Sequence, residues 1–285
     1  MGESRLLKAI SLSMLAKRIL VAGVLLPVGL AAIIVGGIAY EALVAFILSL
    51  AAWEYMQLFE LAGFKPASFV IVGGTLLFVA GRAVNGWESA GWIMTLVIFA
   101  SMTYHLLAFE RGREQAGTEF AITLVGALYF GWLGGYLISL RLLPDGMWWV
   151  LLALPAIWFA DSGAFLVGTQ IGRHKMNHRL SPKKSWEGYF GGILFATVGT
   201  ALLASLFASN AVQTAAITPL RGALLGLSLS SFSILGDLGE SMLKRQVGAK
   251  DSGNLLPGHG GIFDRIDTWL WGTAIGYYII TWFFL

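Results

Sequence analysis

The chain has 285 residues, of which 57% are hydrophobic and 12% are charged, and its mean hydropathy is +0.74. Soluble domains carry about twice that share of charge, so this composition excludes an ordinary soluble protein and indicates an integral membrane protein. The absence of cysteine excludes disulfides and thiolate metal sites. The net charge of +3 does not indicate nucleic-acid binding, because excess Lys and Arg in a membrane protein normally mark its cytoplasmic loops.

Long apolar runs alternate with short polar loops and predict an all-α polytopic membrane protein. Runs of about 20 residues cross ~30 Å of hydrocarbon as helices. They lack the alternation of a transmembrane β-barrel. We predict nine membrane-spanning helices, at residues 19–38, 42–58, 66–81, 91–109, 118–140, 147–171, 186–208, 219–243 and 268–285.

Residues 1–18 precede the first run and combine four cations with leucine and isoleucine. This pattern predicts an amphipathic helix lying at the membrane surface. The run 19–38 is too long for the apolar part of a signal peptide and lacks a clear cleavage site. We therefore expect it to be retained as the first helix.

The distribution of Lys and Arg predicts the orientation of the chain. With the N-terminus in the cytoplasm, 16 of the 19 cations lie inside, and only Arg82, Arg141 and Arg221 lie outside. Cytoplasmic loops of membrane proteins carry such an excess. The two most polar loops, 172–187 and 244–267, then share the cytoplasmic face, onto which we expect a polar active-site cavity to open.

The polar residues concentrate in the second half of the sequence. We therefore divide the chain into residues 1–146, expected to serve as scaffold, lipid access or dimer contacts, and a catalytic half, residues 147–285. The glycine pairs Gly134–Gly135 and Gly191–Gly192 permit close helix packing, within one chain or between two copies. We expect a homodimer.

Two acidic residues fall inside apolar runs, where a charge costs ~2.5 to 3.5 kcal/mol on insertion scales. Glu54 lies near the cytoplasmic end of the second run. We interpret it as a structural carboxylate that bonds to a neighbouring helix or reaches the interface. Asp161 lies about three helical turns before the basic loop that begins at Arg173. We expect it to point into a polar cavity that opens to the cytoplasm.

A third acidic position, Asp237, begins a polar helical face. Glu240, Ser241 and Lys244 follow at offsets of 3, 4 and 7, so all four share one side of a helix. A local ion pair explains Glu240 and Lys244. Asp237, placed between two glycines in an apolar run, is better explained by the binding of a divalent cation.

The loop that follows ends in His259, Gly260 and Gly261, and Asp264 and Asp267 then open the last helix. Paired glycines let backbone N–H groups approach an anion, and a helix N-terminus strengthens such a site. Oxygen ligands with no Cys and a single His indicate Mg²⁺ or a similar cation, with a second cation left open. Such a cation among Lys and Arg is typical of nucleoside triphosphate sites.

The other polar loop, 172–187, is strongly basic. Positive-inside bias and contact with anionic lipid headgroups explain part of this charge. Its two histidines have no third ligand nearby, and we interpret them as solvated. Lys183, Lys184 and Ser185, held between a proline and a glycine, indicate a shaped phosphate-binding turn.

The segment 241–267 carries a motif of 27 residues with more than a dozen specified positions. It reads Ser241-x-x-Lys244-Arg245, then Lys250-Asp251-x-Gly253, then Leu256-Pro257-x-His259-Gly260-Gly261-x-x-Asp264-Arg265-x-Asp267. This motif resembles the signature of the CTP:phosphatidate cytidylyltransferases, also called CDP-diacylglycerol synthases. Residues 180–188 and the pair Asp161–Ser162 are also similar to the bacterial members of that family.

The resemblance implies a polytopic nucleotidyltransferase of the bacterial inner membrane, with its active site facing the cytoplasm. Such an enzyme joins the phosphate of phosphatidic acid to the α-phosphorus of CTP in phospholipid biosynthesis. It releases pyrophosphate and leaves CDP-diacylglycerol in the bilayer. The resemblance also implies a magnesium requirement.

We assign roles within this family hypothesis. Asp237 and Asp264 are expected to bind the metal, with Asp161 and Asp267 as further ligands or as supporting groups behind them. The cationic and hydroxyl side chains expected to hold the CTP phosphates and the lipid headgroup are Lys183, Lys184, Ser185, Lys244, Arg245, Lys250 and Arg265. His259, Gly260 and Gly261 are expected to orient a phosphate or the leaving pyrophosphate.

Two other functions are compatible with parts of the sequence. An ion-coupled transporter would use Asp161, Asp237 and Glu54 as a relay, but the charges gather at one face and the inverted repeat of many transporters is absent from the sequence. A CTP-using enzyme could instead act on a polyprenol-type lipid. Turnover of CTP with each lipid separates these alternatives.

Overall fold

The structure is a computed structural model that describes residues 19, 21–211, 216–256 and 260–285. The surface helix expected within residues 1–18 and the predicted site residue His259 lie outside this described part of the chain.

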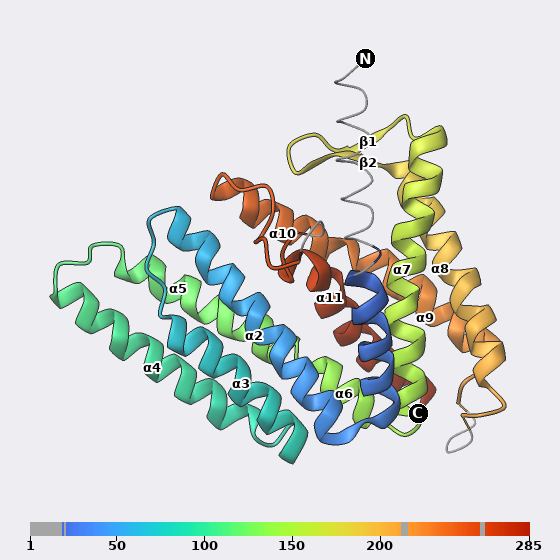
Figure 1. Cartoon of the computed structure of the whole chain (residues 1–285), viewed down its shortest axis with the longest axis horizontal. Helices are drawn as coiled ribbons and strands as arrows, with labels where there is room; N and C mark the ends of the chain where they lie inside the picture. Colours follow the sequence, from blue (N-terminus) through green and yellow to red (C-terminus); the bar gives the residue numbers. More distant parts are fainter. Residues whose placement is uncertain (1–18, 20, 212–215, 257–259) are drawn as a thin grey trace.

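The described chain is a bundle of helices with one small hairpin at its upper end (Figure 1). An unlabelled helix, Val21–Val35, comes first. The labelled helices are α2 (Gly37–Leu61), α3 (Ser68–Asn85), α4 (Ala90–Glu110), α5 (Ala116–Ala127), the π-helical η1 (Leu128–Leu133), α6 (Tyr136–Leu142), α7 (Gly146–Ile171), α8 (Trp186–Phe207), α9 (Pro219–Phe232), α10 (Ile234–Gln246), α11 (Phe263–Ile279) and the π-helical η2 (Ile280–Phe284).

The predicted helical membrane protein is confirmed in its main features. Seven helical segments of the described chain are long and apolar enough to cross a membrane, with α5 to α6 forming one of them and α9 to α10 another. Val21–Val35 is apolar but shorter, and α11, with 17 residues, carries charged residues near its start. Large apolar side chains such as Val84, Phe165 and Phe283 are exposed on the outside of the bundle, as expected for surfaces that contact lipid.

Helix α11 packs against helices from both halves of the chain. In Figure 1, α2 to α5 lie on one side, α7 to α9 lie on the other, and α10 and α11 lie between them. Helix α11 contacts α2, α6 and η1 as well as α7 and α9. Leu48, Trp149 and Phe263 belong to one continuous hydrophobic core. The N-terminal half therefore packs directly against the segment that carries the sequence motif.

The glycine pairs considered for dimer contacts serve packing within the chain. A Cβ on Gly191 would lie 2.5 Å from a Val167 methyl, and one on Gly192 would lie 2.5 Å from the Ala160 carbonyl oxygen. A Cβ on Gly134 would lie 2.7 Å from the Leu48 side chain. These contacts explain the glycines without a second copy.

The basic loop departs from the all-α expectation. It folds into a two-stranded antiparallel hairpin, β1 (Lys175–Asn177) and β2 (Ser181–Ser185), in which Lys175 pairs with Ser185. The Ser185 hydroxyl accepts a hydrogen bond from the Gly188 N–H at 3.2 Å and so caps the first turn of α8. Lys183 and Lys184 are therefore held on a strand rather than on the predicted turn.

The predicted helix 219–243 is broken at Ser233 into α9 and α10. The hydroxyls of Ser230 and Ser231 donate to carbonyl oxygens of the preceding turn, each at 2.7 Å, a pattern that bends helices. The break sends the polar residues of α10 toward α11.

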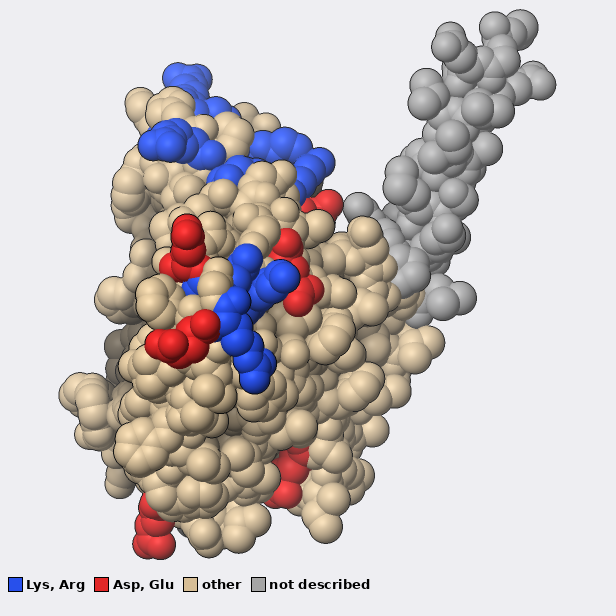
Figure 2. All heavy atoms as spheres, turned by 90° about the vertical axis from the view of Figure 1, so that its left-hand side faces the viewer, with Lys and Arg blue, Asp and Glu red and all other residues tan. Residues whose placement is uncertain are grey.

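The charged side chains are unevenly distributed along the molecule. On the face shown in Figure 2, Lys and Arg lie in the upper and middle parts, and its lower end carries none. The upper end is the one that carries the hairpin in Figure 1.

Candidate active site

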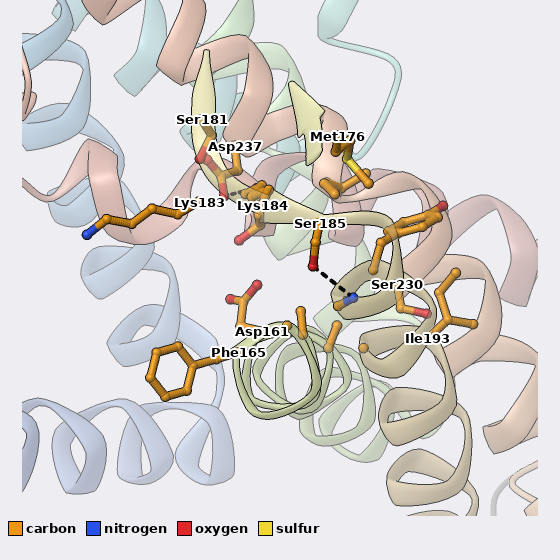
Figure 3. Close-up of a pocket in the computed structure, with 18 of the residues that line it drawn as sticks. Asp161, Phe165, Met176, Ser181, Lys183, Lys184, Ser185, Ile193, Ser230 and Asp237 are labelled. Atoms are coloured by element: carbon orange, nitrogen blue, oxygen red, sulfur yellow. Dashed lines mark hydrogen bonds and ion pairs between the residues drawn. The ribbon is translucent and has the colours of Figure 1, made fainter. Parts of the chain in front are cut away.

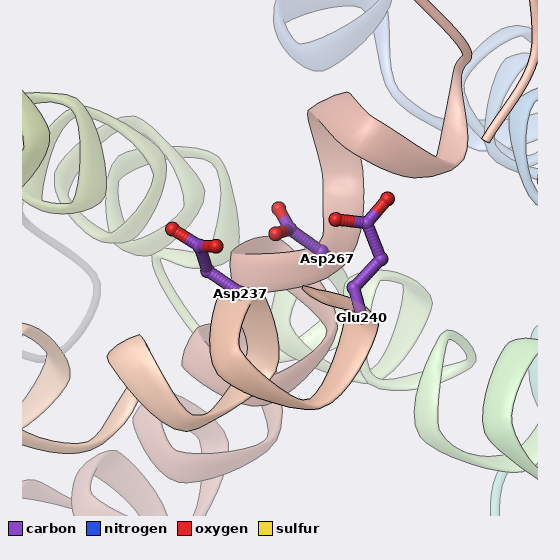
Figure 4. A group of neighbouring side chains, drawn as sticks. All are labelled: Asp237, Glu240 and Asp267. Atoms are coloured by element: carbon purple, nitrogen blue, oxygen red, sulfur yellow. The ribbon is translucent and has the colours of Figure 1, made fainter. Parts of the chain in front are cut away.

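The close crossing of α10 and α11 creates a group of three carboxylates. Gly236 lies so near the Asp267 carbonyl oxygen that any Cβ at this position would collide with it. The crossing brings Asp237 and Glu240 of α10 together with Asp267 of α11, and one oxygen from each lies within 4.8 Å of the others (Figure 4). Glu240 and Asp267 are buried, and Asp237 is half-buried.

A cavity of about 370 Å³ adjoins this group. Its polar wall carries Asp161 of α7, Lys184 of β2 and Asp237 (Figure 3). The Lys184 ammonium is ion-paired with the Asp237 carboxylate. Asp161 is exposed to this space, where its charge interacts with Asp237 and Lys184, so the predicted polar cavity is present. Apolar side chains, among them Phe165 and Ile193, also line the cavity.

A second ion-paired cation, Lys244, bridges the carboxylate group to the final loop. Its Nζ lies 2.7 Å from Glu240 Oε2 and 2.5 Å from Asp264 Oδ1, and its side chain is almost entirely buried. The local Glu240–Lys244 pair expected from the helical spacing is confirmed.

Asp264 has a different environment from the other carboxylates of the site. Its Oδ2 accepts hydrogen bonds from the Ser252 N–H, the Ser252 hydroxyl and the Gly261 N–H, each at 2.9 Å. Within the described residues, Asp264 thus fixes the loop and Lys244, whereas Glu240 lies in the carboxylate group with Asp237 and Asp267. Direct metal binding by Asp264 stays a prediction.

The donor set fits a hard divalent cation. Five carboxylates surround the site, contributed by Asp161, Asp237, Glu240, Asp264 and Asp267, and two lysines pair with three of them. Glu240 Oε1 is buried and has no hydrogen-bond partner within the described chain. Such excess negative charge with oxygen ligands alone is typical of Mg²⁺ sites, and a buried charge needs a partner.

The remaining predicted cations lie on the surface of the described chain. Lys183, Arg245, Lys250 and Arg265 are exposed, and no carboxylate within the described residues forms an ion pair with them. In Figure 3 the Lys183 ammonium points away from the cavity. These four side chains are available to bind anions from solution.

The glycines of the motif shape the loop around Asp264. Gly261 donates its N–H to Asp264, and the Gly260 carbonyl accepts a hydrogen bond from the Leu256 N–H at 3.0 Å. Gly260 also lies beside Asp264, since a Cβ at this position would be 2.9 Å from Asp264 Oδ2. The sequence predicted that these N–H groups approach an anion. At Gly261 the group that accepts from the N–H is the carboxylate of Asp264.

Three residues of the site were not singled out as functional from the sequence. Glu240 could have been recognised, because it lies on the same helical face as Asp237. Ser252 carried no signal beyond its place in the motif. Glu54 was interpreted as structural, and the structure confirms that its carboxylate bonds to another segment, accepting from the Ser252 hydroxyl and the Phe263 N–H.

A helical membrane bundle with clustered carboxylates, lysines and a half-apolar cavity is suited to an enzyme that binds anionic substrates at the membrane. The chain belongs to the cytidylyltransferase family, whose model matches residues 16–283. The resemblance drawn from residues 241–267 is thereby confirmed.

Curated relatives named phosphatidate cytidylyltransferase occur in several bacteria. The protein of Synechocystis sp. is 31% identical over 292 residues, which cover 93% of this chain and 96% of the relative. That of Bacillus subtilis is 34% identical over 249 residues, covering 84% and 89%. That of Pseudomonas aeruginosa is 36% identical over 262 residues, covering 90% and 93%.

Proposed function

We propose that this chain transfers the cytidylyl group of CTP to phosphatidic acid, which yields CDP-diacylglycerol and pyrophosphate. The observation that carries the proposal is the cavity itself, which is lined both by Asp161, Lys184 and Asp237 and by apolar side chains of α7 and α8. Such a cavity suits a substrate with a phosphate head and an apolar body. The family and the printed name of the relatives support the same reaction.

The reaction needs positioning more than proton transfer. A phosphate oxygen of phosphatidic acid attacks the α-phosphorus of CTP, the bond from that phosphorus to the oxygen bridging to the β-phosphorus breaks, and pyrophosphate leaves with the bonding electrons. The attacking oxygen is already anionic and needs no strong base. Cations must offset the repulsion between the two substrates, and in-line alignment supplies much of the acceleration.

The carboxylate group would hold Mg²⁺. Asp237, Glu240 and Asp267 are suitable ligands, with Asp161 and Asp264 close enough to support them. When bound, the ion would offset phosphate charge. Lys184 and Lys244 lie beside these carboxylates. The exposed cations, Lys183, Arg245, Lys250 and Arg265, would hold the outer phosphates of CTP.

We place the site on the cytoplasmic side of the bacterial inner membrane. The excess of Lys and Arg in the loops that include the hairpin supports this orientation. The upper placement of cations on the face in Figure 2 is consistent with it. We also propose nine membrane-spanning helices and a homodimer. Reporter fusions at each loop would test the number of helices, and cross-linking in native membranes would test the homodimer.

A CTP assay in detergent micelles tests the reaction. We expect CTP to be consumed when phosphatidic acid is present, with CDP-diacylglycerol and pyrophosphate formed in equal amounts. Chelation of divalent cations should abolish turnover, and added Mg²⁺ should restore it, because the oxygen-only ligand set suits that ion. Faster CTP turnover with a polyprenol than with phosphatidic acid would identify the polyprenol as the acceptor. Absence of CTP turnover with either lipid would favour a transporter.

Replacement of Lys184 tests the role of the hairpin. Lys184→Gln should lower kcat/KM for CTP by about 100-fold, the loss typical when one positioned donor is removed from a charged transition state. Lys175→Gln, on the neighbouring strand and exposed, is the matched control for loss of one positive charge. An unchanged KM and kcat for Lys184→Gln would mean that this lysine contributes only to the orientation of the chain in the membrane.

A further inference from the structure

Glu54 is a fully buried carboxylate that the proposed reaction does not use. It lies on α2, in the half of the chain expected to be scaffold, yet both of its hydrogen bonds go to the motif near the C-terminus. Its Oε2 accepts from the Phe263 N–H at 2.9 Å and from the Ser252 hydroxyl at 3.0 Å. A carboxylate buried in a membrane helix needs partners, since an unpaired charge there is costly.

The motif backbone packs directly onto this carboxylate. A Cβ on Gly253 would lie 2.6 Å from Glu54 Oε1, and a Cβ on Gly261 would collide with Oε2. Two glycines of the motif therefore leave room for Glu54, rather than only for a phosphate. The side chain of Glu54 extends from α2 and occupies the space that Gly253 and Gly261 leave in the loop.

The contact extends from Glu54 to the charged site through Ser252. The Ser252 Oγ lies 3.0 Å from Glu54 Oε2 and 2.9 Å from Asp264 Oδ2. The hydroxyl proton can serve only one of these oxygens at a time. The Ser252 N–H also donates to Asp264, whose other oxygen pairs with Lys244. A shift of Ser252 would therefore move Asp264 and Lys244.

Glu54 also holds the start of α11. Phe263 is the first residue of that helix, so its N–H has no partner within the helix, and Ile262 before it supplies no side-chain cap. Asp264 and Asp267 follow in the first two turns. The carboxylate of Glu54 thus fixes both the loop and the helix that carry the acidic residues of the site.

We infer that Glu54 is a positioning residue for cytidylyl transfer, acting by hydrogen bonds that hold residues 252–263 against α2 and keep Asp264 and Lys244 in place. The inference rests on the proposed function for its kinetic readout. The N-terminal half then contributes to the geometry of the site as well as to its support.

Two substitutions at Glu54 separate hydrogen bonding from charge. Glu54→Ala removes the oxygen that accepts both hydrogen bonds, and we expect kcat/KM for CTP to fall about 100-fold, since a misplacement of about 1 Å can cost that much. Glu54→Gln retains an amide oxygen that can accept both hydrogen bonds, and its kcat/KM should stay within about tenfold of the parent enzyme. Glu60→Ala, on the same helix but exposed, is the matched control.

Limited proteolysis provides a readout that does not need turnover. Glu54→Ala should speed trypsin cleavage after Arg245 or Lys250 relative to cleavage after Lys175 in the hairpin, whereas Glu54→Gln should not. If the parent protein lacks CTP turnover, the proposed reaction fails, but the cleavage ratio still tests whether Glu54 holds the loop.

The Ser252→Ala variant provides a second test of the inference if a Glu54 variant fails to fold. It should lower kcat/KM by itself, and it should add little when combined with Glu54→Ala, because the residues act through one chain of contacts. Normal kinetics and cleavage in Glu54→Ala, equal losses in Glu54→Ala and Glu54→Gln, or fully multiplicative effects with Ser252→Ala would each overturn the inference.

Discussion

Asp237→Asn should abolish cytidylyl transfer while the protein stays folded. Asp237 joins the carboxylate group and also pairs with Lys184 in the cavity, so its charge lies where both cation and phosphates are expected. Loss of one such charge should reduce kcat by at least about 10³-fold. The initial rate of CDP-diacylglycerol formation from CTP and phosphatidic acid measures the effect.

Folding should survive this change, because Asp237 and Lys184 are both partly exposed and ion pairs of that kind contribute little to stability. The thermal midpoint in detergent should therefore match that of the parent protein. Glu88→Gln, which removes an exposed charge between α3 and α4, is the control and should retain full activity. Near-normal turnover in Asp237→Asn would refute the assignment of Asp237 as a metal ligand.

Asp264→Asn should abolish activity and also destabilise the protein. The two oxygens of Asp264 accept from Lys244 and from three donors of the final loop. An asparagine amide turns one acceptor into a donor, so it must face either the ammonium or the N–H groups. A buried donor left without an acceptor costs about 1 to 3 kcal/mol.

The measurement is the thermal midpoint in detergent at a fixed heating rate, alongside the CTP assay. We expect the midpoint to fall by several degrees for Asp264→Asn and to stay unchanged for Asp237→Asn. An inactive Asp264→Asn variant with an unchanged midpoint would assign Asp264 mainly to the cation, whereas an active variant would remove it from the catalytic group.

Much of the chemistry could be predicted from residue types and spacing. Lys244, Asp264 and Asp267 belong to a motif dense enough to identify the family, and Asp237 lies one helical turn before it; the family match covers most of the chain. Asp161 was recognisable because a carboxylate inside an apolar run needs a reason to be there. The residues of the site could thus be proposed before their contacts were known.

The contacts between these residues could not be predicted in the same way. Helical periodicity reports which side chains share a face of one helix, and it correctly paired Glu240 with Lys244. Periodicity does not predict which face of α11 packs against α10. Gly236 decides this, because the absence of its side chain lets α10 approach the Asp267 backbone and brings Glu240 into the carboxylate group.

The sequence by itself determined that this protein is a helical membrane enzyme of a known family. Hydrocarbon thickness imposes long apolar helices on any sequence that crosses it, and the spaced motif identifies the family. Only the tertiary structure decided that Glu54 supports the motif, since these segments lie 209 residues apart. Helix packing brings such distant residues into contact, and no local pattern in the sequence records which buried carboxylate will face which loop.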